Sequence, residues 1–127
     1  STAQNDFRKQ WVEAVDLYAQ GDFKASLQIW NHLTSRPESA DFKSDINYPA
    51  GLTAMQAGDF KTAISFFENI PPGYFISDKP WNLALCQLRA GRLSEAKKGF
   101  EQIAGSDSPY AGEARRILAN VERIEPL

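Results

Sequence analysis

Hydrophobic residues recur at the spacing of an amphipathic helix almost from the start of the chain. In residues 6–20 the apolar side chains stand three and four positions apart, which places them on one helix face. They are Phe7, Trp11, Ala14, Val15, Leu17 and Tyr18. The pattern predicts a helix from about Asp6 to Gln20, while the polar residues 1–6 are expected to be frayed or to cap it.

A short pattern follows this helix and occurs three times. Each copy has a glycine, a small residue five positions later, an aromatic residue four positions after that, and an aliphatic residue three further on. The copies are Gly21, Ser26, Trp30 and Leu33; Gly58, Ala63, Phe67 and Ile70; and Gly91, Ala96, Phe100 and Ile103. Such a repeat predicts pairs of helices, because the glycine ends one helix, the small residue lets the next helix approach it, and the aromatic side chain fills the gap. Asp22 and Asp59 are expected to cap the second helices.

The other residues that start or end helices, such as prolines, place the remaining elements of an all-α chain. Pro49 is tolerated in the first turn of a helix, so a short helix is expected from Asn47 or Tyr48 to Ala57. The predicted segments of one domain, 1–127, are repeat 1 at about 6–36, a connection at 37–46, repeat 2 at about 47–72, repeat 3 at about 77–105 and a last helix at about 108–123, which together give seven helices.

The glycines of the repeated pattern lie 37 and 33 residues apart (58 − 21 and 91 − 58), close to the 34-residue period of one repeat family. The chain resembles the tetratricopeptide repeat (TPR) family over roughly residues 8–123, most closely from Trp81 through Gly91 to Phe100. It departs from the family pattern at Ser26, where Ala is usual. The resemblance implies a right-handed α-α superhelix, a TPR-like solenoid of about three helix pairs, with the last helix as a cap.

Composition and charge narrow the function classes. Hydrophobic content of 43% and charged content of 24% are ordinary for a globular protein, and a net charge of −2 provides no field that attracts nucleic acid. No stretch of 18 apolar residues occurs, so we expect no membrane contact by this segment itself. The chain does not begin with Met, and we expect a processed product or a piece of a longer protein, with any anchor outside these residues.

Candidate chemistry is sparse, and no enzyme activity, metal or cofactor is predicted. The single cysteine, Cys86, lies in an apolar helical run and is expected to be packed and inert. The single histidine, His32, is expected to have a surface or packing role. Asp41 and Asp45 are expected in a solvated loop. The glycines are expected at helix ends, so no phosphate-binding loop is predicted.

The candidate partner-binding residues follow from the TPR resemblance, which implies that the first helix of each pair lines a concave face. Trp11, Tyr48 and Trp81 each stand ten residues before a repeat glycine, and Trp11 and Tyr48 are expected to be the more exposed. The full set is Trp11, Val15, Tyr18, Tyr48, Leu52, Met55, Trp81, Leu85, Leu88 and Arg89. Two interpretations of this apolar stripe stay open. The more common one is burial against neighbouring helices, and the other is an exposed groove that binds a partner.

The pattern therefore favours a non-enzymatic module that binds a protein segment through an apolar, aromatic face. The alternative is an accessory or self-association domain of a longer envelope enzyme or sensor, in which case the chain would form a homodimer. A glycan or small-molecule binder would need an enclosed polar pocket. The third repeat and the Ser-Pro-Tyr-Ala start of the last helix resemble envelope-attached bacterial repeat proteins, which implies a periplasmic or membrane-anchored site outside the cytoplasmic membrane, with the cytoplasm as the alternative.

Overall fold

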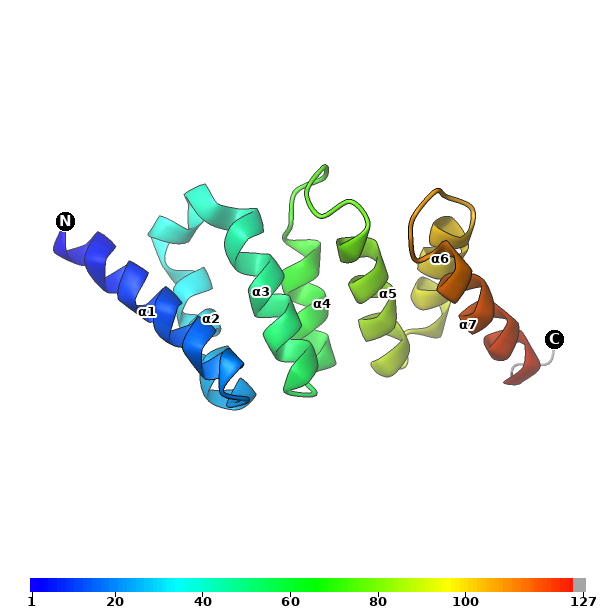
Figure 1. The fold of residues 1–127 in the computed structure, drawn as a ribbon, viewed down its shortest axis with the longest axis horizontal. Helices are drawn as coiled ribbons and strands as arrows, with labels where there is room; N and C mark the ends of the chain where they lie inside the picture. The colour runs from blue at the N-terminus through cyan, green and yellow to red at the C-terminus, as the bar shows by residue number, and fades with distance from the viewer. Residues whose placement is uncertain (125–127) are drawn as a thin grey trace. The chain divides into compact units, whose positions relative to one another are not determined.

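The computed structural model describes residues 1–124, which form seven α-helices and one short 3-10 helix, with no strand among them (Figure 1). The elements are α1 (Thr2–Ala19), α2 (Phe23–Ser35), η1 (Pro37–Phe42), α3 (Lys43–Gln56), α4 (Phe60–Glu68), α5 (Asp78–Arg89), α6 (Leu93–Ala104) and α7 (Ala111–Ile124). Helices consecutive in the chain pack as pairs, α1 with α2, α3 with α4, and α5 with α6, and α7 packs on α6. The all-α class, the three pairs and the last helix are confirmed.

The helices fall into two compact units, one formed by Ser1–Pro71 and the other beginning at Pro72. The first unit contains α1 to α4 and η1, and the second contains α5 to α7. In the first unit, α1 and α3 run in the same direction and α2 returns between them (Figure 1). A single domain of three repeats stays a prediction from the sequence.

The turn inside each helix pair has the same backbone geometry in all three repeats. Gly21, Gly58 and Gly91 have φ angles of 82°, 78° and 81°, the left-handed region that glycine adopts without steric cost. The residue after each glycine donates its backbone N–H to a carbonyl of the preceding helix, in a Schellman motif. These bonds join Asp22 to Leu17 (2.9 Å), Asp59 to Ala54 (2.9 Å) and Arg92 to Gln87 (2.8 Å). The predicted role of the repeat glycines is confirmed.

Aspartate caps complete two of these turns. The carboxylate of Asp22 accepts the backbone N–H of Ala25 (3.3 Å), and that of Asp59 accepts the N–H of Thr62 (3.2 Å). Each cap satisfies one of the donors left unpaired at a helix start. Both predicted caps are therefore present.

Close helix contacts also follow the repeated pattern. Ser26, Ala63 and Ala96 are all buried. The Ser26 hydroxyl donates to the Ala14 carbonyl on α1 (2.7 Å), which gives the serine a bonding role where the other two repeats have alanine. Gly51 on α3 faces the ring of Phe67 on α4, and a Cβ added at Gly51 would lie 2.7 Å from Cζ of that ring.

The expected start of the first helix is wrong by four residues (6 − 2), because α1 begins at Thr2. Ser1 and Gln4 form a reciprocal capping box. The backbone N–H of Gln4 donates to Oγ of Ser1 (3.2 Å), and the terminal amino group of Ser1 donates to Oε1 of Gln4 (3.2 Å). These bonds satisfy donors at the helix start, so the polar terminal residues are helical.

The expected start at Asn47 or Tyr48 is also wrong, because α3 begins at Lys43 and contains Pro49 in its interior. An interior proline costs about 3 kcal/mol. Burying an isoleucine contributes about 1.5–3 kcal/mol, and Ile46, in the added turn, is fully buried. Asn47 also donates its side-chain amide to the Lys43 carbonyl (2.8 Å). These interactions offset the proline penalty, and only Pro37–Phe42 of the expected connection lies outside α3.

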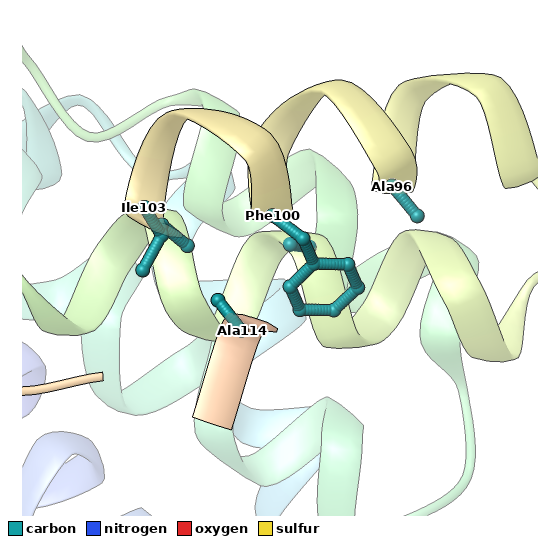
Figure 2. Packing of buried hydrophobic residues seen from close by; sticks show 5 residues of the cluster. Ala96, Phe100, Ile103 and Ala114 are labelled. Atoms are coloured by element: carbon teal, nitrogen blue, oxygen red, sulfur yellow. The ribbon is translucent and has the colours of Figure 1, made fainter. Parts of the chain in front are cut away.

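The second unit has its own apolar core. Figure 2 shows Ala96, Phe100 and Ile103 of α6 with Ala114 of α7, and Ala84 of α5 completes this buried cluster. The last helix begins at Ala111, three residues after Ser108, and covers one side of the cluster. None of the helices within residues 1–124 is long and apolar enough to cross a membrane.

Candidate functional site

The third copy of the predicted stripe belongs to the core of the second unit. Trp81, Leu85 and Leu88 pack against the cluster of Figure 2. The Trp81 ring stacks on Tyr110 (centroids 4.8 Å apart, 3° between planes) and meets Phe100 edge-on (5.8 Å, 71°). Internal packing therefore accounts for this copy, and Arg89 at its end is exposed.

The first two copies come together in the first unit around a small cavity, which we call the apolar pocket. Its volume is about 110 Å³. It is lined by Val15 and Tyr18 of α1, Trp30 of α2, and Pro49, Leu52 and Thr53 of α3. Val15 is 46% exposed, while Trp30 is fully buried. Two predicted residues of α1 thus lie beside one of α3, as expected for a continuous face.

Trp11, one helical turn before Val15, lines a larger cavity of about 560 Å³, which we call the aromatic pocket. Its lining residues are Gln4, Phe7, Arg8, Trp11, Glu38, Asp41, Phe42 and Asp45. The rings of Phe7, Trp11 and Phe42 form a mutual cluster, with all three centroid separations between 6.0 and 6.5 Å. Such separations suit aromatic pairing, so the rings support one another as a wall.

Arg36 ties the two sides of the aromatic pocket together. Its guanidinium pairs with Asp6 on α1 (3.1 Å) and with Glu38 on η1 (3.0 Å), and it also donates to the Ala3 carbonyl (3.2 Å). The hydrogen bond to Glu38 raises the pKa of Arg36, and the same bond lowers the pKa of Glu38. This clip joins the start of α1 to η1, and both elements line the pocket.

The remaining predicted residues of the first unit lie on α3. Tyr48 and Met55 are half-buried, and the Tyr48 ring lies 6.0 Å from that of Phe67. Trp11 is half-buried too, as is Trp81, so exposure does not separate these three aromatic residues. Val15 is the most exposed hydrophobic residue of the predicted set.

Sequence reasoning missed Phe7 and Phe42 as pocket residues. Phe42 ends a 3-10 helix, where no helical periodicity identifies its face, although it is 44% exposed. Asp41 and Asp45 are exposed as predicted, but the expected loop is wrong, because Asp41 lies in η1 and Asp45 in α3, and both residues line the aromatic pocket. The sequence signal that could have predicted this pocket is Phe42 next to Asp41, with Asp45 four residues after Asp41.

The groups considered for catalysis have ordinary surroundings. Cys86 is fully buried, and desolvation raises the pKa of its thiol to about 11, which disfavours the nucleophilic thiolate at neutral pH. His32 is exposed on α2. Among the side chains that the structure describes, no three from His, Cys, Asp or Glu are grouped so that they could hold a metal ion.

Comparison of the sequence with models of protein families gives no match, and comparison with curated proteins gives none either. The two pockets of the first unit, which both lie along α1, define the candidate site. Their arrangement along α1 and α3 is the basis for the function proposed next.

Proposed function

We propose that this chain is a non-enzymatic protein-interaction module of the TPR type, and that the face formed by α1 and α3 binds a segment of a partner protein. The observation that carries the proposal is the placement of the aromatic and apolar pockets one after the other along α1. Trp11 lines one pocket and Val15 lines the other. Preformed cavities with aromatic walls are typical places for the anchoring side chains of a partner.

The spacing of the pockets sets the size of the segment. Trp11 of the aromatic pocket and Tyr18 of the apolar pocket are seven residues apart, which corresponds to about 10 Å along a helix at 1.5 Å per residue. An extended chain covers that distance in about three residues, and a helix covers it in two turns. The face thus suits a segment that inserts two side chains separated by about 10 Å.

Contacts between the elements that line the pockets favour binding. The Arg36 clip and the Trp11–Trp30 contact (6.0 Å, 76°) hold the pocket walls in place before a partner arrives. Binding to a preformed surface avoids part of the entropy cost of ordering side chains. The gain in free energy then comes from apolar burial at the two pockets, while polar residues at the rim set orientation.

The test compares two valines on the same helix. Val15, 46% exposed, lines the apolar pocket, whereas Val12, 55% exposed, lines neither pocket and lies with Asn5 and Lys9 on α1. Proteins captured from an extract of the native source are quantified on immobilised wild-type chain, Val15→Asp and Val12→Asp. We expect Val15→Asp to lose the specific partner and Val12→Asp to retain it, since only the first places a charge in the apolar pocket.

Equal capture by both variants would contradict the proposal, provided that thermal melts show both to be folded. The same variants also address self-association. A wild-type dimer in light scattering that Val15→Asp converts to a monomer would make this face a contact between two copies of the chain.

A further inference from the structure

The aromatic pocket differs from the apolar pocket in its charge. Asp41 and Asp45 line it together with Phe7, Trp11 and Phe42. Neither carboxylate has an ion-pair partner among the described residues, whereas Glu38 is engaged by Arg36. The cavity therefore presents two available anionic groups beside an aromatic wall.

The lining as a whole is negative. It has three carboxylates, from Glu38, Asp41 and Asp45, and one guanidinium, from Arg8, so its formal charge is −2 (1 − 3). Aromatic faces attract cations through their quadrupole. The same ring cluster already has one cationic neighbour, because the Arg36 guanidinium lies 5.4 Å from the centroid of Phe7.

We propose that the aromatic pocket receives a lysine or arginine side chain of the partner segment, while an apolar side chain about 10 Å away enters the apolar pocket. This inference rests on the proposed function and names the chemistry of its partner: a basic, amphipathic peptide segment. Charge complementarity sets its direction, since the cation lies toward η1 and the apolar anchor toward Leu52. An acidic segment would meet two like charges at Asp41 and Asp45.

The first step of the test selects peptides without assuming a sequence. A random twelve-residue library displayed on phage is panned on the whole wild-type chain and, in parallel, on Val15→Asp. We expect peptides that the wild type enriches over Val15→Asp to carry Lys or Arg three positions from an aliphatic or aromatic residue when extended, or seven positions when helical.

The second step measures the charge contribution with one synthetic selected peptide and its Arg→Gln or Lys→Gln analogue. The double variant Asp41→Asn with Asp45→Asn keeps side-chain shape at two exposed positions. The control, Glu13→Gln with Asp16→Asn, makes the same charge change at exposed α1 residues that line neither pocket. In fluorescence anisotropy at low salt, we expect the Asp41/Asp45 variant to bind the peptide about five- to twentyfold more weakly and the control to change it less than about twofold.

The analogue should bind the wild type more weakly than the selected peptide does, but it should bind the Asp41/Asp45 variant equally well. This result would show that the basic group of the peptide interacts with Asp41 and Asp45. Selected peptides without a basic residue, or equal binding by the Asp41/Asp45 variant, would overturn this inference and leave the proposed function standing. No enrichment on the wild type over Val15→Asp would overturn both. Selected peptides that match this chain's own sequence would replace the partner with a second copy and would also overturn the inference.

Discussion

The contact between Gly51 and Phe67 offers a direct test of how closely α3 and α4 pack. Replacing Gly51 with alanine would place Cβ 2.7 Å from Cζ and 2.8 Å from Cδ1 of the Phe67 ring. Ordinary carbon contacts are about 3.5–4.0 Å, so the ring would have to move by roughly 1 Å. Phe67 is fully buried and its ring lies against Tyr48, which limits that movement.

Two opposing effects set the size of the change. Overpacking a buried site costs about 1–3 kcal/mol, and replacing an interior helical glycine with alanine stabilises a helix by about 0.8–1.0 kcal/mol. The Phe67 contact involves three ring atoms, so we take the cost in the upper part of its range. The expected net loss in the free energy of unfolding is about 1–2 kcal/mol.

Gly112 provides the matched control, because a Cβ added there would have no neighbour within 4 Å. Gly112→Ala in α7 should therefore be neutral or stabilise the chain by up to about 1 kcal/mol. Urea unfolding followed by circular dichroism and tryptophan fluorescence measures both variants, with Trp11 and Trp30 reporting on the first unit. A Gly51→Ala variant as stable as the wild type would refute the close contact between Gly51 and the Phe67 ring.

Two further predictions concern the second unit. Tyr110→Phe removes the hydrogen bond that the tyrosine hydroxyl donates to Asp78 (2.6 Å) but keeps the stack on Trp81, so urea unfolding should show that the free energy of unfolding falls by about 1 kcal/mol. Tyr74→Phe, at an exposed tyrosine, should leave the free energy of unfolding unchanged, and equal values for the two variants would contradict the contribution of this hydrogen bond. Because the pKa of the Cys86 thiol is raised to about 11, roughly a thousandth of it is thiolate at pH 8. Iodoacetamide should therefore label the folded chain far more slowly than the urea-unfolded chain, and the labelling rate of the folded chain should increase as the pH rises toward 11. Rapid labelling of the folded chain at pH 8 would contradict the burial of Cys86.

The sequence predicted the fold best where one residue type has one physical role. Glycines with positive φ, aspartate caps and small residues at helix contacts all lie where the repeated pattern put them. The errors occur where tertiary packing outweighs a local signal, as with Pro49 inside α3, where burial of Ile46 offsets the proline penalty.

The candidate site was only partly predictable. Helical periodicity correctly placed Val15 and Leu52 on neighbouring helix faces, because both stand in regular helices. It could not separate that pair from Trp81, which has the same register but packs on Tyr110 in the second unit. Phe42 escaped prediction because its position depends on the path of η1 between α2 and α3.

The most direct test of the central claim is the affinity of the captured partner, or of a selected peptide, for Val15→Asp and Val12→Asp by isothermal titration calorimetry. If the α1 and α3 face is the binding site, Val12→Asp should bind within about twofold of the wild type. Val15→Asp should bind at least about tenfold more weakly, since it loses an apolar contact and desolvates a charge. Equal affinities of the two folded variants would contradict the claim and place the binding surface elsewhere on the chain.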